Sequence, residues 1–143
     1  MLEEGTICGK VFLSVRNKKK ILIIDDDVLH LEIAAEILQD EQLEVIAHSD
    51  GASVLDRVKT VRPDLVLLDI NMPGVSGDEL VALVRADAKI SHIPLVYYSS
   101  YDEDTLRKLV SASGASGYIC KWNIGELQKK VKQHLNLSLS EPE

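Results

Sequence analysis

The chain has few cysteines, no long apolar run and no excess of positive charge. Its two cysteines, Cys8 and Cys120, give neither a disulfide framework nor the ligand spacing of a metal site. The longest apolar runs, at residues 21–24 and 65–68, are far below the roughly 18 residues that a membrane span needs. The first residues are acidic and do not form a secretory signal. These absences predict a cytoplasmic protein without a membrane partner.

Charge and length further narrow the class of protein to which the chain can belong. The 143 residues include 16 Lys and Arg against 23 Asp and Glu, so the formal net charge is −7. This balance argues against direct binding of nucleic acid through neutralised phosphates. Apolar residues make up 45% of the chain and charged residues 27%, which is typical of one globular domain. The basic run at residues 18–20 is expected to be a solvated approach to the first strand.

Short apolar runs alternate with segments of helical periodicity. Runs typical of buried strands lie at residues 21–24, 43–47, 65–68, 94–98 and 117–120. A segment with apolar residues at helical spacing follows each of them. Strands that are apolar on both faces and alternate with helices predict a parallel sheet covered on both sides, with right-handed crossovers. The predicted fold is a doubly wound α/β domain of five strands and five helices.

The ends of this pattern set the expected domain boundaries. Residues 1–18 are expected to be an N-terminal extension without an assignable role, residues 19–136 the domain, and residues 137–143 a tail. In the last helix, Asn123 and Glu126 predict a capping box. The apolar stripe predicted for that helix is Ile124, Leu127, Val131 and Leu135.

Polar residues interrupt the apolar runs at the strand ends. Asp25 and Asp26 follow the first strand, and Asp69 follows the third. Ser99 and Lys121 follow the fourth and fifth strands. Ligands of open parallel sheets collect outside these carboxyl ends. If the strand order is 2-1-3-4-5, the first and third strands are neighbours and their carboxylates converge.

Converging carboxylates repel one another and need protons or a cation to compensate them. An oxygen-only ligand set suits Mg²⁺, and a phosphoryl group can share a metal held there. Lys121 and Ser99 could then hold other phosphoryl oxygens, with Asp69 as the nucleophile that forms an acyl phosphate. Taken singly, each residue has a structural explanation, since acids often decorate helix N-termini. Their joint occurrence at four strand ends favours the phosphoryl site.

Three segments carry a resemblance to a known family. They are residues 21–26, residues 63–77 and residues 114–121, and in the middle segment the acid, Asn, Met-Pro and Gly stand at the family's spacing. From about residue 20 to residue 135, the chain resembles the CheY-like receiver domain of two-component response regulators. The resemblance implies a flavodoxin-like (βα)5 fold with strand order 2-1-3-4-5.

The resemblance also implies roles for individual residues. Asp69 would accept a phosphoryl group from a histidine kinase or a phosphotransfer protein, with Lys121 and Ser99 beside it. The implied Mg²⁺ ligands are Asp26, Asp69, the backbone carbonyl of Asn71, and Asp25 through water. Ser99 and Tyr118 would form the switch.

The implied output is a change in partner binding. The fourth helix, fifth strand and fifth helix would bind an unknown downstream protein, and a homodimer is consistent with the family. The protein would not be an enzyme beyond its own phosphorylation and dephosphorylation.

The sequence departs from the family at residue 122. The usual Lys-Pro is replaced by Lys121-Trp122, and the bond between them is expected to be trans because a non-proline cis bond costs roughly 2.5–4 kcal/mol. Trp122 is expected to cap the core, with a partner anchor as the alternative. The four histidines show no ligand spacing, and Lys132 in the last helix is expected to be solvated.

Two other functions fit part of the pattern. A pseudo-receiver would keep the fold and bind partners without phosphorylation; the full acid set argues against it, whereas Trp122 leaves it open. A haloacid dehalogenase-type phosphatase also uses Asp, Ser or Thr, Lys and Mg²⁺. That fold needs an acidic pair on a strand after its Lys, and beyond Lys121 the acids are Glu126, Glu141 and Glu143.

Overall fold

The computed structural model describes residues 18–40, 42–50, 53–72 and 75–137. Nearly all of the predicted N-terminal extension and C-terminal tail lies outside these residues, so both remain predictions. None of the helices in the described ranges has the length and apolar character to cross a membrane.

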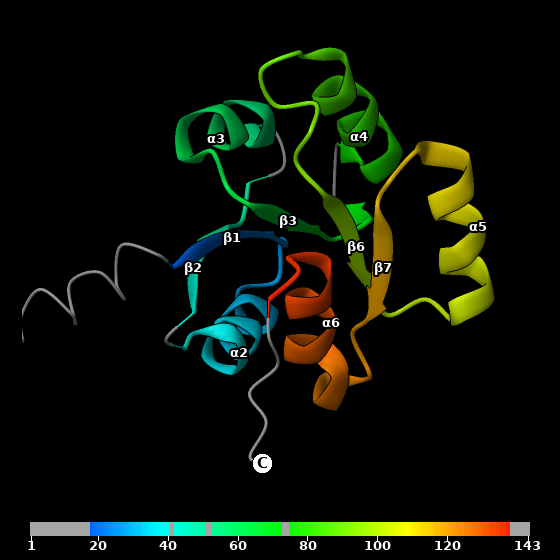
Figure 1. Ribbon diagram of the computed structural model, residues 1–143. Coiled ribbons are helices and arrows are strands. Elements are labelled where there is room, and N and C mark those ends of the chain that lie inside the picture. Colours follow the sequence, from blue (N-terminus) through cyan, green and yellow to red (C-terminus); the bar gives the residue numbers. More distant parts are fainter. Residues whose placement is uncertain (1–17, 41, 51–52, 73–74, 138–143) are drawn as a thin grey trace, which may run out of the picture.

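Five parallel strands form the central sheet (Figure 1). Their bounds are β1 (Lys19–Ile24), β2 (Leu43–His48), β3 (Leu65–Leu68), β6 (Leu95–Ser99) and β7 (Gly117–Cys120). The order β2-β1-β3-β6-β7 is the predicted 2-1-3-4-5 order, which is therefore confirmed. A short antiparallel pair, β4 (Asn71–Met72) and β5 (Val75–Ser76), lies in the segment predicted as a loop.

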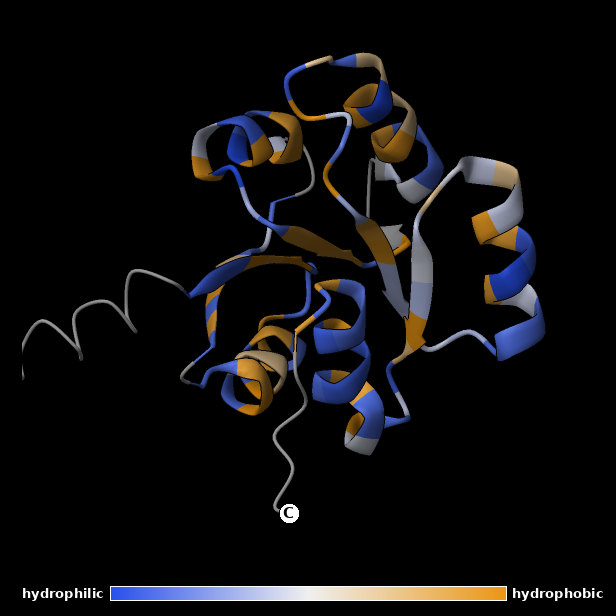
Figure 2. Cartoon of the chain, in the orientation of Figure 1, coloured by the Kyte–Doolittle hydropathy of each residue, from blue (hydrophilic) through white to orange (hydrophobic). Residues whose placement is uncertain are grey.

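Helices cover both faces of the sheet (Figure 1). They are α2 (Val28–Leu38), α3 (Val54–Val61), α4 (Gly77–Ala86), α5 (Glu103–Ser113), the short 3₁₀ helix η2 (Ile124–Glu126) and α6 (Leu127–His134). Alternate residues of β1 point to opposite sides: Ile21 and Ile23 pack with α2 and α6, and Leu22 and Ile24 pack with α3 and α4. The apolar strands thus lie between two layers of helices (Figure 2). This arrangement explains why the strands read as continuous apolar runs.

Side-chain caps start several helices immediately after the strands. Asp27 accepts hydrogen bonds from the backbone N–H groups of Leu29 (3.0 Å) and His30 (3.4 Å) and so caps the N-terminus of α2. Asp102 caps α5 in the same way. Such caps satisfy backbone donors that the first helical turn leaves unpaired.

The predicted start of the last helix is wrong. Asn123 makes no side-chain capping bond, and the chain forms the 3₁₀ turn η2 before α6 begins at Leu127. Ile124 is exposed and does not belong to the buried stripe, whereas Leu127 and Val131 are buried as expected. The apolar period therefore identified the helix but placed its start one turn too early.

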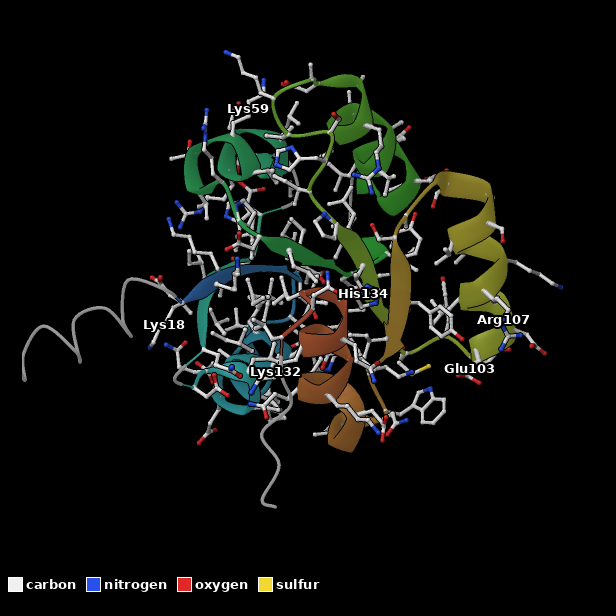
Figure 3. All side chains as sticks on the ribbon, in the orientation of Figure 1. Lys18, Lys59, Glu103, Arg107, Lys132 and His134 are labelled. Atoms are coloured by element: carbon white, nitrogen blue, oxygen red, sulfur yellow. The ribbon has the colours of Figure 1, made fainter. Side chains whose placement is uncertain are left out.

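Lys132 is buried, which contradicts its predicted solvated position (Figure 3). Its Nζ lies 2.8 Å from Asp40 Oδ2, and Gln128 Nε2 donates to the same oxygen at 3.3 Å. Burial alone would raise the pKa of Asp40, but hydrogen bonds from Lys132 and from the backbone, with the charge of Lys132, hold it below its ordinary value of 3.8. The pair ties α6 to the end of α2.

Removal of Asp40 should destabilise the fold more than removal of Lys132. Asp40→Ala leaves a buried ammonium uncompensated and should lower the free energy of unfolding by roughly 2–3 kcal/mol, whereas Lys132→Met should cost less than about 1 kcal/mol. Because the pKa of Asp40 is lowered in the folded state, its contribution should be complete above pH 3.8 and disappear as the pH falls through the lowered pKa. Urea unfolding of both variants across pH measures this. Equal losses would show that packing, and not charge, is responsible.

Candidate functional site

Strand register brings the acidic residues together. Ile24 pairs with Leu68 in the parallel ladder of β1 and β3, so the next residues, Asp25 and Asp69, lie side by side at the carboxyl edge. The N–H of Asp69 donates to the carbonyl of Ile24 at 2.9 Å. Carboxylate oxygens of Asp25, Asp26 and Asp69 all lie within 4.8 Å of one another. Asp25 and Asp69 are buried, and Asp26 is exposed.

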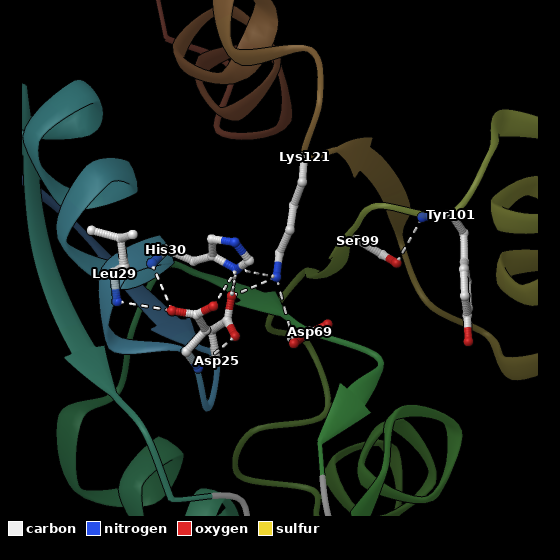
Figure 4. Close-up of polar contacts among 8 residues, drawn as sticks. Asp25, Leu29, His30, Asp69, Ser99, Tyr101 and Lys121 are labelled. Carbon is white, nitrogen blue, oxygen red and sulfur yellow. Dashed lines mark hydrogen bonds and ion pairs between the residues drawn. The ribbon is translucent and has the colours of Figure 1, made fainter.

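Lys121 reaches into this cluster from the end of β7 (Figure 4). Its Nζ donates to Asp25 Oδ2 at 2.6 Å and lies 3.5 Å from Asp69 Oδ2. Its backbone N–H donates to the carbonyl of Ser99 at 2.7 Å, which fixes the start of the Lys121 side chain at the carboxyl edge of the sheet. Among these groups, three carboxylates face one ammonium, so negative charge remains in excess.

The pKa of Asp25 reflects two opposing effects. Burial disfavours the charged carboxylate and alone would raise the pKa. Hydrogen bonds from Lys121 and from the N–H of Asp27 (3.0 Å), together with the charge of Lys121, outweigh burial and lower it below its ordinary value. Asp25 therefore remains a carboxylate at neutral pH.

The donor set fits a divalent cation. Hard cations such as Mg²⁺ prefer oxygen ligands, and Mg²⁺ retains several waters, so few protein ligands suffice. The three carboxylates supply such oxygens, and the excess negative charge of the cluster favours a second positive charge beside Lys121. Asn71 lies in β4, two residues after Asp69, and its carbonyl as a ligand remains a prediction.

Comparison with known proteins identifies the family. The sequence profile of the response regulator receiver domain matches residues 21–132. The chain belongs to this family.

Individual proteins are similar to this chain in sequence and in structure. Chemotaxis protein CheV2 of Helicobacter pylori is 29% identical over 127 residues, which cover 86% of this chain and 41% of CheV2. The DNA-binding response regulator MtrA of Mycolicibacterium paratuberculosis is 33% identical over 126 residues, which cover 87% of this chain and 55% of MtrA. The chain thus spans about half of these relatives or less. The BeF3-activated N-terminal receiver domain of Klebsiella pneumoniae RstA is 31% identical, with a TM-score of 0.73 over 81% of this chain and 97% of that chain.

The two predicted switch residues of this receiver, Ser99 and Tyr118, lie in β6 and β7. Ser99 is buried at the end of β6, and its Oγ accepts a hydrogen bond from the N–H of Tyr101 at 3.2 Å (Figure 4). Tyr118 is partly buried in β7, and its hydroxyl donates to Glu103 Oε2 at 3.4 Å. The ammonium of Lys130 lies 5.8 Å from the centre of the Tyr118 ring. Tyr118 therefore faces α5 and α6.

His30 is a site residue that the sequence did not reveal. Its Nδ1 lies 3.1 Å from Lys121 Nζ and 3.4 Å from Asp25 Oδ2, although it shows no ligand spacing with another histidine. The available signal was positional: His30 lies in the first turn of a helix that begins directly after Asp25 and Asp26. A polar side chain in that turn can reach back to the strand end.

Trp122 does not cap the core as predicted. Its side chain is 63% exposed, and the Lys121–Trp122 bond is trans, as expected. Other large apolar side chains are also exposed next to the site residues. With Trp122 they make up what we call the apolar rim: Val28, Leu29, Trp122 and Ile124. Val28 and Leu29 begin α2 just before His30, and Trp122 directly follows Lys121, so the rim neighbours both residues of that contact in the chain.

Proposed function

We propose that this receiver accepts a phosphoryl group on Asp69 from a histidine kinase or a phosphotransfer protein, in the presence of Mg²⁺, and that phosphorylation changes its affinity for a downstream protein. The convergence of three carboxylates, with Lys121 Nζ 3.5 Å from Asp69, carries the proposal. A carboxylate gains phosphoryl-acceptor chemistry only where nearby cations offset the negative charge of the incoming group.

The proposed transfer is a displacement at phosphorus. A carboxylate oxygen of Asp69 forms the new P–O bond while the P–N bond of the phosphohistidine donor breaks, and the imidazole leaves with the electron pair and takes up a proton from solvent. Lys121 binds a phosphoryl oxygen through its ammonium, and the Ser99 hydroxyl donates to another. Mg²⁺, held by Asp26, Asp69, the Asn71 carbonyl and, through water, Asp25, would supply charge neutralisation for the phosphoryl oxygens.

Small phosphodonors test this proposal without a kinase. The chain incubated with acetyl phosphate and Mg²⁺ should gain the mass of one phosphoryl group, and EDTA should prevent the gain. The related RstA receiver was solved in a BeF3-activated form, which supports beryllofluoride as a second probe. Absence of a Mg²⁺-dependent adduct would favour an unphosphorylated binding module. Turnover of external phosphomonoesters would favour a phosphatase.

The apolar rim is the proposed docking surface for the phosphodonor. Its residues neighbour Asp26, His30 and Lys121 in the chain, and the carboxylates that would receive the phosphoryl group lie at the carboxyl ends of the strands. Exposed apolar side chains around a polar site can contact a partner protein, and they do not themselves bind the charged groups of the site.

The proposed switch has its own test. A phosphoryl group on Asp69 offers strong acceptors that should draw the Ser99 hydroxyl away from the N–H of Tyr101 and allow Tyr118 to leave Glu103. Beryllofluoride with Mg²⁺ should therefore shift the Tyr118 ring resonances, and Ser99→Ala should suppress the shift. Ser111→Ala, at an exposed position of α5, is the matched control. Ring resonances that do not move on activation would contradict the switch.

A further inference from the structure

Three acceptors surround the Lys121 ammonium. It donates to Asp25 Oδ2 at 2.6 Å and to His30 Nδ1 at 3.1 Å, and it lies 3.5 Å from Asp69 Oδ2 (Figure 4). An ammonium has three N–H donors and no lone pair, so in this contact the Nδ1 of His30 is the acceptor, which requires the tautomer with the ring proton on Nε2. The ammonium is thus closer to Asp25 than to Asp69, and His30 lies on the Asp25 side, 3.4 Å from its Oδ2.

We propose that His30 is a positioning residue that holds the Lys121 ammonium beside Asp25 and thereby opposes its movement to a phosphoryl group on Asp69. This inference rests on the proposed function, in which Lys121 binds a phosphoryl oxygen. The flexible four-carbon stem of lysine lets the ammonium exchange partners without movement of the backbone. A hydrogen bond made before phosphorylation and lost afterwards stabilises the unmodified protein, and so weakens binding of the phosphoryl group.

The role of His30 in the fold itself is small. The His30 side chain is 45% exposed. The cap of α2 does not use the His30 ring, because the Asp27 side chain accepts from the backbone N–H groups of Leu29 and His30. Substitution of the ring should therefore leave the fold intact. His30→Phe keeps a flat ring but removes the acceptor, and His30→Asn offers an amide oxygen near the position of Nδ1. His92→Phe is a matched control at an exposed histidine.

Beryllofluoride binding with Mg²⁺ measures the effect on the phosphoryl site. Trp122, the single tryptophan of the chain, directly follows Lys121 and supplies the fluorescence signal. His30→Phe should bind beryllofluoride about three- to fivefold more tightly than the wild type, as expected for the loss of one exposed hydrogen bond from the unmodified state. His30→Asn and His92→Phe should bind like the wild type. Unchanged or weaker binding by His30→Phe would overturn the inference, as would equal tightening in His30→Asn.

A metal-free measurement separates this inference from the proposed function. In ¹⁵N spectra without Mg²⁺, the His30 ring should show an unprotonated Nδ1, and Lys121→Met should shift that resonance while Lys130→Met should not. A His30 resonance that ignores Lys121→Met would refute the contact. If the wild type binds no beryllofluoride, the proposed function fails, whereas the ¹⁵N result still decides whether His30 holds Lys121.

Discussion

Asp69→Asn should yield no phosphoryl adduct with either acetyl phosphate or a phosphohistidine donor. An amide is neutral and far less nucleophilic than a carboxylate, so the bond to phosphorus cannot form at this position. The substitution also removes one of the three carboxylates that converge within 4.8 Å, and with it part of the negative charge that favours a divalent cation. Intact mass measured after incubation with acetyl phosphate and Mg²⁺ is the readout.

The matched control is Asp56→Asn, which alters an exposed carboxylate of α3. It should acquire one phosphoryl group, as we expect for the wild type. Asn has nearly the size of Asp and relieves like charges in the cluster, so the thermal midpoint of Asp69→Asn should not fall below that of the wild type. An adduct of full stoichiometry in Asp69→Asn would place the acceptor elsewhere and refute the proposed role of Asp69.

The fold and the acidic cluster were accessible from the sequence because both follow from local pattern. Strands buried on both faces read as apolar runs, and parallel strands expose their carboxyl ends at one edge. Once β1 and β3 are neighbours, the residues that follow the two strands lie side by side, and the placement of the helices does not change this. This is why Asp25 and Asp69 could be paired from the sequence once the strand order 2-1-3-4-5, which the family resemblance implies, was assumed.

Contacts that depend on how helices are placed were not accessible in this way. Lys132 reads as one of several cations late in a helix, and only the packing of α6 against α2 brings it to Asp40. His30 meets Lys121 because the Lys121 side chain extends from the end of β7 to the first turn of α2, although the two residues are 91 positions apart in the chain. Trp122 was misassigned because an aromatic residue after a strand end fits either the core or the surface by its hydropathy.

The apolar rim should matter for protein donors and not for small ones. Leu29→Ser combined with Trp122→Ser should slow phosphorylation by a histidine phosphotransfer domain that is active on the wild type by roughly 30-fold, which corresponds to about 2 kcal/mol for the loss of central apolar contacts. Both side chains are more than half exposed, so their removal costs little packing inside the receiver. Phosphorylation by acetyl phosphate should keep its wild-type rate, because neither side chain is among the proposed phosphoryl ligands.

Leu83→Ser is the matched control, since Leu83 is also a leucine that is more than half exposed, on α4 and outside the rim. It should be phosphorylated at the wild-type rate by both donors. If the double variant slows both donors to the same extent, the rim supports the geometry of Asp69 and Lys121 and does not dock the donor. If it slows neither, the phosphohistidine protein approaches from another side. Selective loss with the protein donor arises only if the apolar side chains bind the donor itself, because docking raises the local concentration of phosphohistidine without altering the displacement at phosphorus.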